Sequence, residues 1–306
     1  MRRGVRMRPG MRKNSRAWAW VIGLATMVAI NGGAADRTAV TKSTVRAGDG
    51  VNIVCESRGK GETTLLFLHG WCGDRHWWKN QVDEFARDYR VVAIDQAGHG
   101  ESGKDRKEWT LDSLSKDVER VVKELGLKRV IMVGHSMGGP IALGAAKGLP
   151  GRVAAVVGID TLQNAEYKAS EEDLKKFLEA FETDFAGTLR AAMQGMLPDN
   201  VDTNLSNWIV TGAEKQDRRM AMGLMRAFGR VDLKSLFREA KVPVRCINAA
   251  PGAFKFGIPT AAAVNKRYAD FEVVIIEGTG HFPMLEKPAE FNRKLRTVLS
   301  EFAAKN

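Results

Sequence analysis

The chain has 306 residues, of which 44% are hydrophobic and 27% are charged, a composition typical of a globular protein with room for one large domain and an insertion. Its formal net charge is +11, but seven of its lysines and arginines precede Asp36 without an acidic residue among them. The remainder carries about +4, which is too little to indicate a nucleic-acid partner or binding to an anionic membrane.

The basic start is followed by an apolar run over residues 17–30 and by small residues at 31–35. This order is typical of a secretory signal peptide, so we expect cleavage near Ala35 and a periplasmic or secreted protein. The alternative is a membrane anchor, but the run has 14 residues, whereas a spanning helix needs about 20. We therefore expect no stable membrane anchor after cleavage. Translation could also begin at Met7 or Met11, which would leave a leader of more usual length.

The predicted elements begin with two strands, over 39–45 and 51–57, which flank Gly-Asp-Gly at 48–50 and so form a β-hairpin. From residue 64 onward, short runs rich in Val and Ile alternate with helical stretches. Because these runs are apolar on both faces, they indicate buried parallel strands. They lie at 64–69, 91–95, 130–134, 153–160, 242–248 and 271–277. The alternation predicts a doubly wound α/β sheet.

Between residues 162 and 237 the strand pattern is replaced by helical periodicity. A helix with Ser170 as its N-cap is predicted to carry one apolar face, made of Leu174, Phe177, Leu178, Phe181 and Phe185. We expect an insertion over the sheet, because the chain returns to strands at 242. The predicted division is a leader at 1–35, a core at 36–161 and 238–306, and a helical cap at 162–237.

Three cysteines, Cys55, Cys72 and Cys246, allow at most one disulfide and have no metal-site spacing. Cys55 and Cys246 fall in predicted strands, where free and inert core cysteines are expected. Cys72 follows a predicted loop and could be exposed. We expect neither a metal nor a cofactor.

The sharpest motif is Gly-His-Ser-Met-Gly at 134–138, which joins a buried strand directly to a helix. In this context the motif predicts a nucleophile elbow, a tight turn that lifts the hydroxyl of Ser136 above the sheet. The following helix directs its N-terminal amides toward charge that develops beside the serine. The alternative is a merely structural turn.

A serine hydroxyl needs a base to take its proton. His281 is the preferred base, because it follows the strand at 271–277 and so lies at the carboxyl edge of the sheet, where catalytic groups gather. The other histidines are His69, His76, His99 and His135. His69 and His99 lie in Gly-containing loops where they could brace the backbone, and His135 adjoins the serine but its side chain is expected to project differently from the elbow.

An oxyanion needs two backbone donors, and the elbow supplies one from Met137. The loop at 69–74 follows a strand and contains two glycines, so we expect the second donor to be Trp71. Its large ring could also pack beneath the helical insertion, and both roles are compatible.

Four motifs together resemble the α/β-hydrolase superfamily: His-Gly at 69–70, Asp-Gln-Ala-Gly-His-Gly-Glu-Ser at 95–102, the elbow, and Gly-His-Phe-Pro at 280–283 followed by Glu-Lys-Pro at 286–288. The resemblance runs from Val51 almost to the C-terminus. It implies a mostly parallel eight-stranded sheet with a helical cap that shapes the substrate pocket. Dehalogenases and epoxide hydrolases of this superfamily carry Asp at the elbow, so Ser136 argues against both.

The family usually places its acid after the penultimate strand, yet residues 242–257 contain no Asp or Glu. Some members place it after the preceding strand, which here ends in Asp160. Asp160 is therefore the candidate acid, in the order serine, acid, histidine. Asp95 also ends a strand, but the resemblance implies that it organises the loop reaching Ser102.

These residues predict a serine hydrolase that cleaves small to medium carboxylic esters or lactones through an acyl-enzyme. The expected partner is a small-molecule ester. The same machinery serves carbon–carbon bond or peptide hydrolases, and a ligand-binding protein with a decayed triad is an alternative of another class. The missing acid after the penultimate strand is the best support for that alternative.

Overall fold

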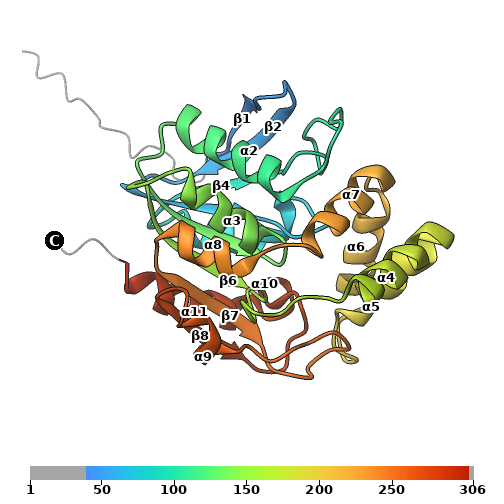
Figure 1. The fold of residues 1–306 in the computed structure, drawn as a ribbon. Helices are drawn as coiled ribbons and strands as arrows, with labels where there is room; N and C mark the ends of the chain where they lie inside the picture. Colours follow the sequence, from blue (N-terminus) through green and yellow to red (C-terminus); the bar gives the residue numbers. More distant parts are fainter. Residues whose placement is uncertain (1–38, 303–306) are drawn as a thin grey trace, which may run out of the picture. The chain divides into compact units, whose positions relative to one another are not determined.

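The computed structural model describes residues 39–302, so the predicted leader at 1–35 lies outside the described residues (Figure 1). Eight strands form one sheet in the order β1-β2-β4-β3-β5-β6-β7-β8. The strands are β1 (Thr41–Arg46), β2 (Asn52–Arg58), β3 (Thr63–Leu68), β4 (Arg90–Ile94), β5 (Arg129–His135), β6 (Val153–Ile159), β7 (Val244–Ala249) and β8 (Phe271–Ile276). β1 and β2 form the expected hairpin, β2 pairs antiparallel with β4, and the remaining pairs are parallel. The predicted mostly parallel eight-stranded sheet is confirmed.

Most of the helices connect consecutive strands along the chain, and the last of them follow β8. They are η1 (Arg75–Trp78), α1 (Lys79–Phe85), α2 (Leu111–Glu124), α3 (Gly138–Lys147), α4 (Glu171–Thr183), α5 (Phe185–Gly195), α6 (Thr203–Glu214), α7 (Arg218–Phe228), α8 (Leu233–Ala240), α9 (Ala262–Asn265), α10 (Pro283–Glu286) and α11 (Pro288–Ser300). α3 packs on β5 and β6 and contacts α2 and α8, whereas α11 packs on β7 and contacts α1. None of the helices in residues 39–302 combines the length and apolarity that a membrane span requires.

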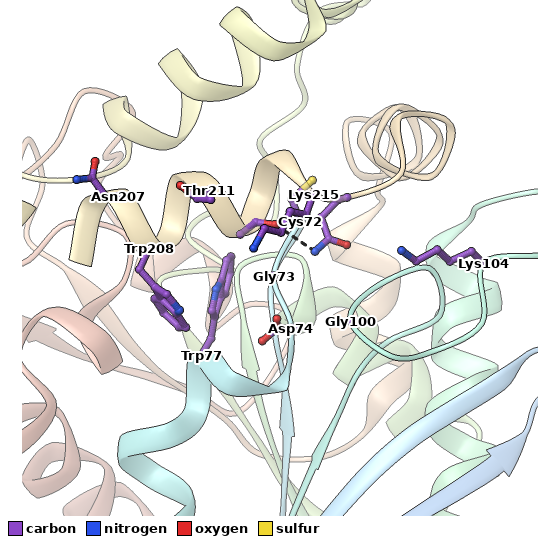
Figure 2. Close-up of a pocket in the computed structure, with 12 residues that line it drawn as sticks. Cys72, Gly73, Asp74, Trp77, Gly100, Lys104, Asn207, Trp208, Thr211 and Lys215 are labelled. Atoms are coloured by element: carbon purple, nitrogen blue, oxygen red, sulfur yellow. Dashed lines mark hydrogen bonds between the residues drawn. The ribbon is translucent and has the colours of Figure 1, made fainter. Parts of the chain in front are cut away.

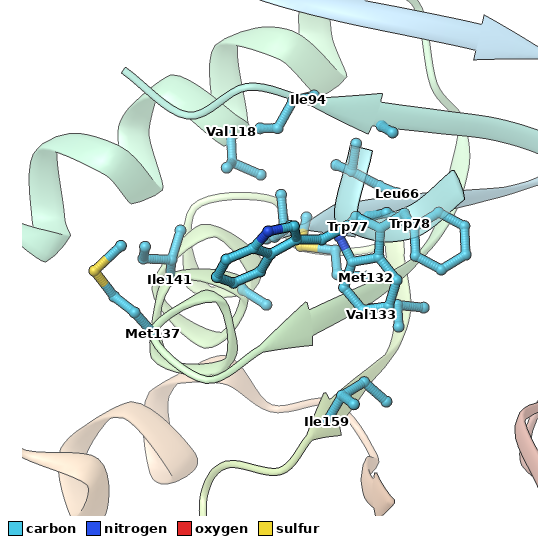
Figure 3. Packing of buried hydrophobic residues seen from close by; sticks show 14 of the residues in the cluster. Leu66, Trp77, Trp78, Ile94, Val118, Met132, Val133, Met137, Ile141 and Ile159 are labelled. Carbon is cyan, nitrogen blue, oxygen red and sulfur yellow. The ribbon is translucent and has the colours of Figure 1, made fainter. Parts of the chain in front are cut away.

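The core explains why the apolar runs become strands. Residues 65–68 of β3 and 130–133 of β5 are almost completely buried, so both faces of these central strands lie against apolar neighbours. Figure 3 shows this packing, in which side chains of adjacent strands meet side chains of α2 and α3; among those labelled are Leu66, Ile94, Met132, Ile159, Val118 and Ile141.

The segment between β6 and β7 is helical, and Figure 1 shows α4, α5, α6 and α7 grouped together at one end of the sheet. Two details differ from the expected pattern. Phe185 does not continue the helix that begins after Ser170, because Asp184 ends α4 and caps α5 by accepting a hydrogen bond from Gly187 N at 2.9 Å. The expected cap boundary at 237 falls inside α8, and α8 packs on α3 of the core.

All three cysteines are free and buried. The expectation that Cys72 could be exposed is therefore wrong: the residue is 1% exposed, because the loop at 69–74 lies beneath helices of the β6–β7 segment. Burial raises the pKa of the Cys72 thiol well above its usual range, so the thiol stays protonated and unreactive.

Candidate active site

The elbow turns at Ser136, between the end of β5 and the start of α3. Ser136 has φ +51, a left-handed conformation that is uncommon for a residue with a side chain. Three hydrogen bonds hold it: Ser136 N donates to Ile159 O at 3.0 Å, and Ser136 O accepts from Thr161 Oγ1 at 2.8 Å and Gly139 N at 3.0 Å. The neighbouring strand therefore fixes the turn.

Glycine is required where this turn folds back on its strand. A Cβ at Gly134 would lie 2.3 Å from the carbonyl oxygen of Gly138, a contact that real side chains do not make. The spacing of the motif is thus a packing requirement, because the helix must start close enough to the strand to present the serine.

His281 lies within hydrogen-bond distance of Asp160. The distance from His281 Nδ1 to Asp160 Oδ2 is 2.5 Å, and the second carboxylate oxygen of Asp160 accepts from Ala249 N at 2.9 Å. The carboxylate is only 4% exposed, so water does not compete for the contact. The pairing favours the His281 tautomer that carries its proton on Nδ1, which leaves Nε2 free to act as a base.

The other candidate acid, Asp95, serves a different network. Its carboxylate accepts from Arg75 N at 2.8 Å and from Glu101 N at 2.8 Å, and it pairs with the buried Arg75 guanidinium. The same guanidinium reaches Glu56 at 2.7 Å and Glu101 at 2.5 Å. Ser102 Oγ donates to Asp95 O at 2.6 Å, so Asp95 organises the loop after β4.

The loop that carries His281 is held by three successive backbone N–H groups. Gly280 N and Phe282 N donate to the two carboxylate oxygens of Glu286 at 2.6 Å and 2.8 Å, and His281 N donates to Met196 O at 2.8 Å. Burial raises the pKa of Glu286, while the two backbone hydrogen bonds act in the opposite direction. Sequence reasoning quoted Glu286 only as part of a motif, and it missed Met196, which acts through its carbonyl.

Ser136 and His281 line one small cavity, whose volume is about 20 Å³. The rest of its wall is made of Trp71, Trp77, His135, Met193, Met196 and Phe282. Among residues 39–302, no hydrogen bond joins the serine hydroxyl to the imidazole. In unliganded sites such contacts are often long and tighten when substrate binds. The cavity beside the serine has room for little more than one water molecule.

Of the two expected oxyanion donors, Trp71 is among the described residues that line this cavity, and Met137 is not. Met137 directly follows Ser136, and Trp71 lines the cavity from the loop after β3. The Trp71 side chain is packed beneath the helical segment: its Nε1 donates to Ala221 O of α7 at 2.8 Å, and its ring meets Phe181 of α4 edge to face. This contact fixes the backbone of the loop.

The remaining buried histidines support the main chain. His69 Nε2 accepts from Gln96 N at 3.0 Å, and His99 Nε2 accepts from Cys72 N at 3.3 Å. His135 Nε2 lies 2.7 Å from His281 O and donates to it. Burial lowers the pKa of each of these three imidazoles, so they stay neutral. The part of the chain that the structure describes contains no group of three or more His, Cys, Asp or Glu side chains placed to hold a metal ion.

Comparison with known proteins places this site in a family. A family model described as the alpha/beta hydrolase fold matches residues 63–231, which is more than half of the chain. A dihydrolipoyllysine-residue acetyltransferase component of the acetoin cleaving system from Cupriavidus necator is 29% identical over 268 residues, covering 82% of this chain and 67% of that protein. A pimeloyl-[acyl-carrier protein] methyl ester esterase from Aliivibrio fischeri is 26% identical over 269 residues, covering 82% and 99%.

Solved structures show the same fold. An esterase from Exiguobacterium antarcticum superposes with a TM-score of 0.76 at 19% identity, covering 85% of this chain and all of that one. A bromoperoxidase from Bacillus anthracis superposes with a TM-score of 0.75 at 20% identity, again covering 85% and 100%. The sheet order, the elbow and the matched family model agree, and this chain belongs to the α/β-hydrolase family.

Proposed function

We propose that this protein is a serine hydrolase that cleaves small to medium carboxylic esters or lactones. The observation that carries the proposal is the 2.5 Å contact between His281 Nδ1 and Asp160 Oδ2, beside an elbow whose Ser136 lines the same cavity as the histidine. This is the arrangement that activates a serine hydroxyl.

The reaction proceeds in two halves. Ser136 Oγ attacks the ester carbonyl carbon while His281 Nε2 takes the hydroxyl proton, and Asp160 stabilises the imidazolium that forms. The backbone N–H groups of Trp71 and Met137 receive the oxyanion. The imidazolium then gives its proton to the departing alcohol, and an acyl-enzyme remains. Water, deprotonated by His281, attacks the acyl carbon and releases the acid and free Ser136.

The size of the cavity favours a short acyl group, which still needs more room than the unliganded cavity offers. Its volume is about 20 Å³ and its wall includes Met193 and Met196 from the helical segment, so longer acyl chains require those side chains to move aside. Activity over a series of acyl chain lengths measures how far the side chains of Met193 and Met196 can move, because the chain length at which kcat/KM falls reports the depth of the pocket.

Names of related proteins support an ester substrate without restricting the chemistry to esters. The relative from Aliivibrio fischeri is a methyl ester esterase, whereas a non-heme chloroperoxidase from Streptomyces lividans is 32% identical over 151 residues. A carbon–carbon bond hydrolase, a peptide hydrolase and a ligand-binding protein on this fold are the alternatives. The intact Asp160–His281 pair weighs against a decayed triad.

The test is cheap. We expect p-nitrophenyl acetate to release a burst of p-nitrophenol and a fluorophosphonate to label Ser136 covalently, because both report an activated serine. Folded protein that gives neither signal would overturn the proposal in favour of the ligand-binding alternative.

We also propose export, on the basis of the basic and apolar leader. The mature chain should begin near Asp36 and lie in the periplasm or outside the cell. N-terminal sequencing of protein from its native host checks this, and an N-terminus that retains residues 17–30 contradicts it.

A further inference from the structure

A second and much larger cavity lies between α6 and the loop that follows β3. Its volume is about 520 Å³. Figure 2 shows α6, with Asn207, Trp208 and Thr211, across the pocket from Asp74 and from Trp77 of η1. The catalytic scheme above does not use this pocket.

The pocket shares a wall with the catalytic cavity. Trp77 lines both. On the catalytic side its ring meets the rings of His135 and Phe282, with centroids 5.5 Å and 5.1 Å away. On the pocket side it lies against Gly73, where a Cβ would be 2.6 Å from the indole. Trp77 is therefore the side chain that the walls of the two cavities have in common.

Two lysines give this pocket a positive wall. Lys104 comes from the loop after β4 and Lys215 from the end of α6, and Figure 2 shows Lys104 extending toward the pocket. Neither ammonium group has an ion-pair partner within residues 39–302, whereas Lys116, Lys147 and Lys266 are all paired with carboxylates.

One carboxylate, Asp74, lines the same pocket, but it is already engaged. Asp74 Oδ1 accepts from His76 N at 2.8 Å and lies 3.1 Å from His76 Nδ1. The hydrogen bond that His76 Nδ1 donates to this carboxylate raises the pKa of His76, and a protonated imidazole offsets the carboxylate charge. The charge left without a partner on the wall is positive.

An amide completes the polar wall. Gln216 lines the pocket, and its Oε1 is buried without a hydrogen-bond partner among the described residues. Its Nε2 reaches Gly212 O only at 3.4 Å. An amide can turn to present either atom, so Gln216 is available to donate to an oxygen anion. In the turned orientation Nε2 takes the place of the unpartnered Oε1, gives up its long contact to Gly212 O, and can donate to a ligand oxygen.

We propose that this pocket binds the carboxylate of an acid-bearing ester, whose scissile carbonyl lies at Ser136 and whose linker runs along Trp77. Lys104 and Lys215 supply the opposite charge, Gln216 supplies a hydrogen bond, and the indoles of Trp77 and Trp208 cover the apolar linker. The inference rests on the proposed esterase function and names its substrate class.

Matched ester pairs test it and show which side of the ester carries the acid. Monomethyl adipate against methyl hexanoate places the carboxylate on the acyl side, and 4-acetoxybutanoate against butyl acetate places it on the alcohol side. In a pH-stat assay we expect kcat/KM to favour the acid-bearing member of one pair by about three- to tenfold, as a partly solvated charge contact allows. Added salt should reduce the preference.

Variants that remove the lysine charges test whether the preference for acid-bearing esters arises in this pocket. The double variant Lys104→Gln with Lys215→Gln should abolish it, whereas Lys107→Gln, on the same loop but outside the pocket, should retain it. A preference absent from both pairs, or one that survives in the double variant, overturns the pocket assignment. If neutral esters are not cleaved and the fluorophosphonate does not label, the esterase proposal itself fails.

Binding gives a readout independent of turnover. Ser136→Ala should bind monomethyl adipate or 4-acetoxybutanoate with a change in tryptophan fluorescence, because Trp77 and Trp208 line the pocket. The affinity should fall by about three- to tenfold when Lys104→Gln and Lys215→Gln are added. Equal affinity for the neutral partner esters overturns the assignment even in protein that has no activity.

Discussion

The sheet and the helical segment between β6 and β7 are built in opposite ways. Residues 65–68 of β3 are buried without exception, whereas α4 buries only Leu174 and Phe181. The ion pair between Arg75 and Asp95 in the sheet region is buried, whereas the ion pair between Arg226 and Glu182 in the helical segment is exposed to solvent. Side chains of the sheet are therefore fixed by packing, whereas exposed side chains of the helices can be substituted with little loss of folding free energy.

The candidate site divides along the same line. Ser136, Asp160 and His281 follow β5, β6 and β8 respectively. The helices supply pocket walls, such as Met193 and Trp208. We infer that the sheet determines which bond is broken and the helices determine which substrate is bound, and variants on each side test this division.

The largest effect is expected from Ser136→Ala. Removing one hydroxyl should lower kcat by about 10⁴- to 10⁶-fold and abolish fluorophosphonate labelling. The fold should remain, because the turn glycines are untouched. Ser300→Ala, on the surface of α11, is the matched control. Residual turnover within tenfold of the parent would show that another serine carries the reaction.

Asp160→Asn comes next. The amide cannot hold the Nδ1–H tautomer of His281 as a carboxylate does, so kcat should fall by about 10³- to 10⁴-fold with little change in KM. Asp199→Asn, an exposed change, serves as the control. If Asp160 only braces the chain through Ala249 N, the variant would lose about 1 kcal/mol of stability and keep its kcat.

Arg75→Met tests the buried network of the sheet side. It leaves Asp95, which is fully buried, without its cation, so the free energy of unfolding should fall by about 3 to 5 kcal/mol. Urea denaturation measures this. Arg58→Met removes the exposed pair with Asp83 and should cost less than about 1 kcal/mol. If the two variants lost equal free energy of unfolding, the expected difference between buried and exposed ion pairs would be wrong.

Glu286→Gln is expected to have the smallest effect. A glutamine side chain has one acceptor oxygen where the carboxylate has two. Either Gly280 N or Phe282 N therefore loses its hydrogen-bond partner, and the loop that carries His281 loosens. We expect kcat to fall about tenfold, with KM nearly unchanged. Glu290→Gln on α11 controls for charge. A shift in KM alone would show that Glu286 shapes the pocket and does not position the base.

The strands were predictable because each is a short apolar run, and the pairing of Asp160 with His281 was predictable because both follow parallel strands. The break at Asp184 was missed because apolar spacing continues through Phe185 while a side-chain cap interrupts the helix. Burial of Cys72 was missed because it depends on helices more than 100 residues away that cover its loop. The role of Met196 has no side-chain signature, since any residue offers a carbonyl there.

That carbonyl has a consequence for protein engineering. Because His281 N donates to Met196 O, the end of α5 is part of the scaffold of the base as well as part of the substrate pocket. A chimera that exchanges the helices between β6 and β7 for those of another enzyme must place a main-chain acceptor at the same point. Selection for new substrates can alter the side chains at 193 and 196 without removing this acceptor, but insertions or deletions there would loosen the histidine.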